Sequence, residues 1–104
     1  MHATIRRYEA IDQTRISELV EKAEACLIPR MSKLPGFIAY YLIEGCNGVV
    51  TSVNFFDTAA HAEESSHVVS DWLREEMLKS ALPNPAQVTF GEVVAQETRV
   101  LVEA

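Results

Sequence analysis

Asn54 and Tyr41 are polar residues within two of the most apolar stretches of this chain of 104 residues. An amide in the middle of a strand is disfavoured, and burying it requires hydrogen-bond partners. Asn54 could therefore orient a carbonyl or phenol group of a bound molecule, with the Tyr41 hydroxyl as a donor. The alternative is that the two side chains satisfy each other, or that Asn54 lies at a sheet margin, because most buried polar groups are simply paired.

Trp72 and His67 are the other candidate catalytic residues. Trp72 falls on the apolar stripe of a predicted helix, where an indole could stack on a planar aromatic substrate or fill the core. His67 is adjacent to that stripe and could act as an acid or base at a pocket mouth, although a solvated surface histidine is the simpler interpretation. His61 lies on a different helix face from His67, so the sequence predicts no metal pair.

Arg6 and Arg7 are neighbours in a predicted strand, so one of them must point inward. A buried guanidinium needs a carboxylate, such as Glu44 or Glu92, or an anionic substrate. A salt bridge is the more common arrangement, and substrate binding is the alternative. The residues predicted to bind substrate are Arg6, Ser52, Val69 and Phe56.

Six elements in the order β-α-β-β-α-β would have to position these side chains. Asp12 is a good N-cap for the first helix, Asp57 or Thr58 caps the second, and Pro29 should kink or break the first. The order predicts an α+β, ferredoxin-like fold, with two helices on one face of a four-stranded antiparallel sheet. It is expected to form one domain over residues 1–104. The predicted strands are 2–9, 37–44, 49–56 and 88–95, with helices from 13 to Pro29 and from 58 to about 82, a possible bulge at Gly91, and an extra strand at 99–102.

The hairpin turn at Asn47-Gly48 decides which side chains of the two central strands share a face. Asn-Gly favours a two-residue loop because both residues tolerate positive φ. Such a loop places Tyr41 opposite Asn54 and Ile43 opposite Ser52. The face beneath the helices would form a pocket wall, and the other face would form a dimer interface. The predicted pocket face holds Phe37, Ala39, Tyr41, Ile43, Val50, Ser52, Asn54 and Phe56, and the predicted interface face holds Ile38, Tyr40, Leu42, Glu44, Val49, Thr51, Val53 and Phe55.

Apolar residues on both faces of these strands predict a homodimer. Two helices cover only one face of a sheet, and the other would expose an apolar patch that monomers rarely tolerate. A second copy packed sheet to sheet about a two-fold axis would cover it, and the tail could pair with the partner. A charge at Leu42 or Val53 should then separate the dimer, whereas a charge at Ala39 should damage the monomer's own fold or pocket.

The composition disfavours several functions. The formal net charge is −6, with nine Lys and Arg against fifteen Asp and Glu, so neither nucleic acid nor an anionic membrane is expected as a partner. No apolar run is long enough to span a membrane and no export signal is visible, which predicts a cytoplasmic protein. Cys26 and Cys46 are then expected to be free thiols, and no metal-ligand spacing is present.

Several local motifs resemble a known family. They are Ile28-Pro29-Arg30, Leu34-Pro35-Gly36-Phe37, Phe56-Asp57 and Trp72 within the second helix. With the order of elements, they resemble the antibiotic-biosynthesis-monooxygenase-like branch of the dimeric α/β-barrel superfamily. The resemblance implies the fold and a dimeric barrel more strongly than the chemistry. Its members include cofactor-independent oxygenases of polycyclic quinols, haem-degrading enzymes and small isomerases.

The resemblance implies two functional hypotheses and no cofactor. Haem-degrading members use an Asn on the first strand, where Arg6 and Arg7 stand here, and a His after the Trp, where none follows Trp72. The first hypothesis is a cofactor-independent monooxygenase acting on an aromatic, quinol-type substrate, with Asn54, Tyr41 and an Arg stabilising charge. The alternative is a non-catalytic stress-response or metabolite-binding dimer. A cavity of roughly 300 Å³ or more, lined by Trp72 and Asn54, would favour the enzyme.

Overall fold

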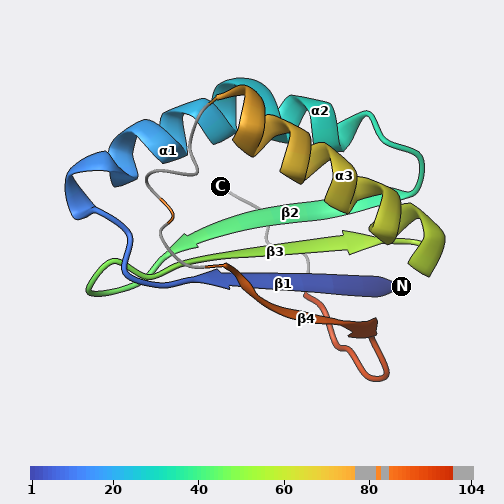
Figure 1. Cartoon of the computed structure of the whole chain (residues 1–104). Helices are drawn as coiled ribbons and strands as arrows, with labels where there is room; N and C mark the ends of the chain where they lie inside the picture. Colours follow the sequence, from blue (N-terminus) through green and yellow to red (C-terminus); the bar gives the residue numbers. More distant parts are fainter. Residues whose placement is uncertain (77–81, 83–84, 100–104) are drawn as a thin grey trace, which may run out of the picture.

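The computed structural model describes residues 1–76, 82 and 85–99. Its elements follow the predicted order (Figure 1). The strands are β1 (His2–Tyr8), β2 (Phe37–Glu44), β3 (Val50–Phe56) and β4 (Gln87–Glu92), and the helices are α1 (Ile16–Lys22), α2 (Ile28–Ser32) and α3 (Ala59–Glu75). The predicted extra strand at 99–102 lies almost entirely outside the described residues.

The four strands form one antiparallel sheet in the order β2-β3-β1-β4. The helices lie together on one face of this sheet, and the other face carries none of the described helices (Figure 1). This arrangement confirms the predicted ferredoxin-like fold. The strand β4 pairs with β1 without a register shift, so the predicted bulge at Gly91 is not present.

Local sequence signals account for the helix starts. Asp12 accepts a hydrogen bond from the backbone N–H of Thr14 at 3.0 Å, and Thr58 accepts one from the backbone N–H of His61 at 3.2 Å. Each side chain thereby satisfies a donor that the first helical turn leaves unpaired. The second helix ends at Glu75, earlier than predicted, and residues 77–81 lie outside the description.

Pro29 does not break the first helix. The chain passes from α1 through a π-helical turn, Ala23–Leu27, directly into α2, where Pro29 occupies the first turn. Proline is tolerated in a first turn because its missing N–H is not needed there. The wider π turn just before it supplies the irregularity that the sequence led us to expect at the proline itself.

The hairpin between β2 and β3 differs from the prediction by one residue. Gly45 donates its backbone N–H to the Val49 carbonyl at 2.8 Å, so Cys46, Asn47 and Gly48 form a three-residue loop. Gly48 has φ +75° and its carbonyl accepts from the Ile11 N–H at 3.0 Å, which ties the loop to the segment after β1. Because a shift of one residue turns the side chains of a strand over, the predicted faces of β2 are exchanged from Ala39 to Glu44. A register shift between Phe37 and Ala39 restores the predicted faces at the start of the strand, where Phe37 lies opposite Phe56 and Ile38 is exposed.

The two sheet faces therefore differ from those predicted on β2 from Ala39 onward, but not on β3. Val50, Ser52, Asn54 and Phe56 lie on the helix-covered face as predicted and are buried. On β2, the residues that join them are Phe37, Tyr40 and Leu42, opposite Phe56, Asn54 and Ser52. Tyr41 and Ile43 lie opposite Val53 and Thr51 on the uncovered face, and Tyr41 is 57% exposed. The predictions that Tyr41 and Ala39 face the helices, and that Tyr40 and Leu42 face a partner, are wrong.

The core lies between the helices and the inner face of the sheet. The buried residues of α3 are Ala62, Ser65, Val69 and Trp72, which is the stripe predicted from the helical spacing. The 3-10 turn Gln13–Arg15, α1, the π turn and α2 contribute Ile16, Leu19, Ala23, Leu27 and Met31. This packing fixes the positions of the strands and of α3, between which the candidate site lies.

Candidate functional site

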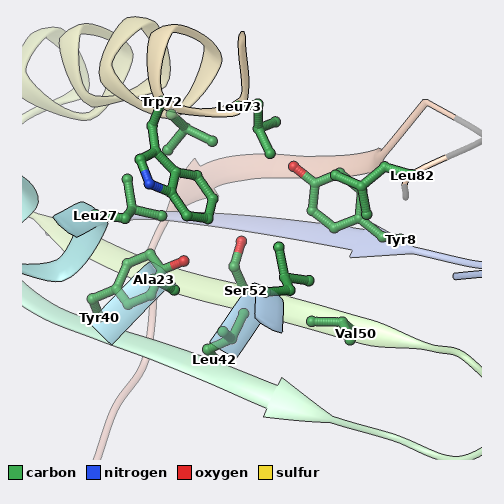
Figure 2. A pocket seen from close by; sticks show the side chains of 12 residues that line it. Tyr8, Ala23, Leu27, Tyr40, Leu42, Val50, Ser52, Trp72, Leu73 and Leu82 are labelled. Carbon is green, nitrogen blue, oxygen red and sulfur yellow. The ribbon is translucent and has the colours of Figure 1, made fainter. Parts of the chain in front are cut away.

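An apolar pocket lies between the sheet and the helices. Trp72 and Leu73 reach into it from α3, and Leu27 and Ala23 come from the π turn (Figure 2). The free space is about 30 Å³, which is room for roughly two water molecules. The lining residues are Tyr8, Leu19, Ala23, Leu27, Tyr40, Leu42, Val50, Ser52, Val69, Trp72, Leu73 and Leu82.

Three hydroxyl groups supply the polar part of this lining. They belong to Tyr8 on β1, Tyr40 on β2 and Ser52 on β3, and all three appear in Figure 2. Burial raises the pKa of Tyr40 to about 12, and the charge of Arg6 and a hydrogen bond with Ser52 offset this only in part. Burial also raises the pKa of Tyr8. Both phenols therefore stay protonated near neutral pH and can donate hydrogen bonds to a guest molecule.

The pocket wall carries no carboxylate, imidazole or ammonium group among the described lining residues. His67, the predicted acid or base, is an exposed residue of α3 and does not belong to this wall. Its proposed position at the pocket mouth is therefore not supported. Proton abstraction inside the pocket has no obvious base, since tyrosines with raised pKa values are poor bases at neutral pH.

Arg6 lies on the same inner face, beside the pocket. It stands opposite Ser52 in the sheet, and its side chain is buried against α3, where Nη2 donates to Ser66 Oγ at 2.6 Å. Within the described part of the chain, Arg6 makes no ion pair, so the predicted bridge to Glu44 or Glu92 is not formed. Burial lowers the pKa of Arg6 from its usual value, but an arginine remains charged.

Asn54 is fully buried on the inner face of the sheet, where its pair with Thr4 neighbours the pair of Arg6 with Ser52. It lies between Thr4 on β1 and Tyr40 on β2, and neither atom of its amide has a hydrogen-bond partner among residues 1–76, 82 and 85–99. The predicted pair with Tyr41 does not form, because Tyr41 lies on the other face, edge-on to Phe55 at 6.5 Å between ring centroids. Asn54 is thus an inner-face residue that does not line the pocket itself.

The structure brings together only part of the predicted site. Ser52, Val69 and Trp72 line the pocket, Arg6 and Asn54 lie beside it, and the fully buried Phe56 packs in the core, edge-on to Phe37. Tyr41 and His67 lie elsewhere. The sequence analysis missed Tyr8 and Tyr40. Alternation from Arg6 could have placed Tyr8 on the inner face, whereas Tyr40 required the correct hairpin loop.

The described residues contain no group of three or more His, Cys, Asp or Glu that could hold a metal ion. Cys26, in the π turn, and Cys46, in the hairpin loop, are free thiols. None of the helices in the described ranges is long and apolar enough to cross a membrane.

Comparisons with known proteins reveal similarity in structure alone. No family model matches the sequence, and no curated protein matches it either. Among solved structures, Rv0793 from Mycobacterium tuberculosis has a TM-score of 0.74 and 17% identity, over 93% of this chain and 98% of that one. A monooxygenase from the gene ActVA-Orf6 of Streptomyces coelicolor, in complex with the ligand Nanaomycin D, has a TM-score of 0.74 and 18% identity, over 95% and 92%.

Another match is a dimeric ferredoxin-like protein from an uncultured marine organism, with a TM-score of 0.74 and 14% identity, over 95% of this chain and 92% of that one. At these identities the likeness concerns the fold and not the chemistry. Several of the similar structures are named as antibiotic biosynthesis monooxygenases. The resemblance predicted from the sequence is thus confirmed at this level: the chain has the ferredoxin-like fold of the antibiotic biosynthesis monooxygenases.

Proposed function

We propose that this chain binds a small, planar, oxygen-bearing molecule in the pocket beneath Trp72. The observation that carries this proposal is the composition of the pocket wall. Apolar side chains surround three convergent hydroxyl groups, those of Tyr8, Tyr40 and Ser52, under one indole ring. A mostly apolar wall with a few placed polar groups is the usual form of a small-molecule site. The indole N–H of Trp72 also lacks an acceptor within the described residues.

The pocket must open before such a molecule can enter. Its free space of about 30 Å³ is far below the roughly 300 Å³ of an ordinary ligand site. Trp72 and Leu73 enter this space from α3, so we infer that a ligand of ordinary size requires these side chains to move. The cavity therefore does not reach the roughly 300 Å³ that would have favoured the enzyme, and Asn54 does not line it.

The uncovered face of the sheet supports a homodimer. Ile38, Tyr41 and Ile43 of β2 are about half exposed there. Val53 and Phe55 lie beside them on the neighbouring strand, β3. A groove of about 500 Å³ crosses this face, lined by Tyr41, Phe55, Ile38 and residues 93–98 in part. A second copy packed on this apolar patch would remove it from water, as a two-fold sheet-to-sheet contact does.

Cofactor-independent oxygenation of a quinol-type substrate is the second candidate, favoured by the names of the similar folds. The substrate would reduce O₂ itself, so that one oxygen atom enters the substrate and the other leaves as water. Because no base lines the described pocket wall, the substrate would have to enter already deprotonated. The three hydroxyls would then donate to its anionic oxygen.

Intrinsic fluorescence tests the binding proposal directly, because Trp72 is the only tryptophan of the chain. Titration with naphthols and hydroquinones should quench or shift its emission with saturation, and N-acetyltryptophanamide controls for light absorbed by the ligand. Ser52→Val should weaken binding, whereas Ser70→Val, on the exposed side of α3, should not. Absence of any saturable change would contradict the proposal. Oxygen consumption with the same panel then separates a binding protein from an oxygenase.

A further inference from the structure

Arg6 is a buried cation that forms no ion pair with any of the described residues. Its side chain is 8% exposed, and Nη2 donates to Ser66 Oγ at 2.6 Å. Its other terminal nitrogen, Nη1, is buried and has no hydrogen-bond partner among the described residues, and no described carboxylate lies within ion-pair distance. A guanidinium removed from water normally requires a carboxylate or another anion beside it. Residues 1–76, 82 and 85–99 leave that requirement unmet.

Polar side chains near Arg6 also lack hydrogen-bond partners among the described residues. Thr4 lies two residues from Arg6 on β1. It stands opposite Asn54 of β3 in the sheet. The Thr4 hydroxyl and both atoms of the Asn54 amide are buried without a partner in the described part of the protein. Arg6 Nη1 and Asn54 Nδ2 are donors, and the Thr4 hydroxyl can donate as well. Donors gathered beside a positive charge suit an anionic oxygen, which accepts several hydrogen bonds at once.

This polar cluster adjoins the pocket. Arg6 faces Ser52 across the β1–β3 ladder, and Ser52 contributes to the pocket wall. Tyr8 and Tyr40, which also line the pocket, are close enough to Arg6 to interact with it electrostatically. The described wall contains no acidic side chain that would repel an anion. Arg6 is not itself a lining residue, but it stands opposite Ser52 on the same face, so a negatively charged oxygen bound over Ser52 would be near this cation.

We propose that the molecule bound beneath Trp72 is an oxyanion, a phenolate or carboxylate on a planar ring, whose charged oxygen pairs with Arg6. This inference rests on the binding function proposed above and adds the charge of the ligand. The apolar wall and Trp72 hold the ring, while Arg6, together with Ser52, holds the charge. Arg6 is then a ligand-binding residue and not a support of the fold.

Paired probes of equal shape test this inference. The wild-type protein is titrated with 1-naphthoate and with 1-naphthamide, its neutral counterpart, and binding is followed by Trp72 fluorescence at fixed ionic strength. We expect naphthoate to bind at least tenfold more tightly. Arg6→Gln should remove this preference and leave naphthamide binding unchanged. The matched control is Arg7→Gln, which removes the same charge from an exposed residue paired with Glu9 at 2.9 Å. Titration with 1-naphthol above and below its own pKa compares binding of a phenolate with binding of the neutral phenol.

The possible outcomes separate the two proposals. Equal binding of naphthoate and naphthamide, unchanged by Arg6→Gln, would overturn the anion site and leave the pocket in place. No binding of either probe would overturn the binding function, and the anion site with it. Thermal unfolding of Arg6→Met without ligand gives a second measurement. A melting temperature equal to or above that of the wild type supports a ligand role, because an unpaired buried charge has been removed. A large fall would assign Arg6 to the fold and overturn the inference.

Discussion

Tyr40 and Asn54 stand directly opposite each other on the helix-covered face of the sheet, whereas Tyr41 lies opposite Val53 on the uncovered face. This pairing places the Tyr40 hydroxyl in the pocket wall and directs the next residue of the chain out of it. Two tyrosines that are neighbours in the sequence therefore belong to different surfaces, one to the candidate ligand site and one to the candidate dimer interface.

Replacing these two tyrosines separately should give different results. We expect Tyr40→Phe to weaken binding of a naphthol by about two- to tenfold, because a typical hydrogen bond contributes roughly 0.5–1.5 kcal/mol. Tyr41→Phe should leave binding unchanged, since its hydroxyl lies on the other face. Titration of Trp72 fluorescence measures both. Weakening by Tyr41→Phe alone would show that the ligand occupies the uncovered face.

A charge in the middle of the uncovered face should dissociate the proposed dimer. Val53 lies between Ile5 and Tyr41 on this face. Val53→Glu would bury a carboxylate against an apolar partner surface, and we expect the dissociation constant to rise by about a hundredfold or more. Light scattering and sedimentation measure the change, with circular dichroism to verify that the monomer stays folded.

Leu42→Glu is the matched control for that experiment. Leu42 lines the inner pocket, so a carboxylate there should lower the free energy of unfolding by about 3 kcal/mol or more through its own desolvation. Loss of folded protein, not dissociation into folded monomers, is the expected result. A folded, monomeric Leu42→Glu together with a dimeric Val53→Glu would place the interface on the inner side of the sheet.

The raised pKa of Tyr40 predicts a loss of stability at alkaline pH. The folded protein holds this phenolic proton more tightly than the unfolded chain, where a tyrosine has a pKa near 10. The contribution is complete below about pH 10 and is lost as the pH rises to about 12, the pKa in the folded state. Its full size is about 2–3 kcal/mol. Urea unfolding from pH 9 to 11.5 should show the decline, and Tyr40→Phe should reduce its slope.

Gly48 should be hard to replace because it fixes the hairpin. Its φ is +75°, and a Cβ there would lie 2.7 Å from the Ile11 carbonyl oxygen. We expect Gly48→Ala to lower the free energy of unfolding by about 1–3 kcal/mol. Gly91→Ala is the control, since a Cβ at Gly91 has no neighbour within 4 Å. Equal stability of the two variants in denaturant titration would contradict the role assigned to the Gly48–Ile11 contact.

Local patterns in the sequence determined the order of elements, the helix caps and the buried stripe of α3. Asp12 and Thr58 cap their helices through atoms two or three residues away, and Ala62, Ser65, Val69 and Trp72 follow from helical spacing alone. The helix caps and the buried stripe depend on neighbours in the chain, so the sequence alone predicts them. The apolar character of both strand faces is likewise visible in the local sequence pattern.

Only the tertiary structure decided which side chains meet. The faces of β2 depend on whether the hairpin loop has two or three residues, and the docking of Gly48 on Ile11, far away in the sequence, settles that count. Within the described ranges, the partner of Arg6 is a serine of α3 and not a carboxylate, and the pocket beneath Trp72 has only about 30 Å³ of free space. Such contacts join elements that are distant in the chain. A shift of one residue, which local preferences barely distinguish, exchanges the side chains of β2 from Ala39 onward between the inner and outer faces of the sheet.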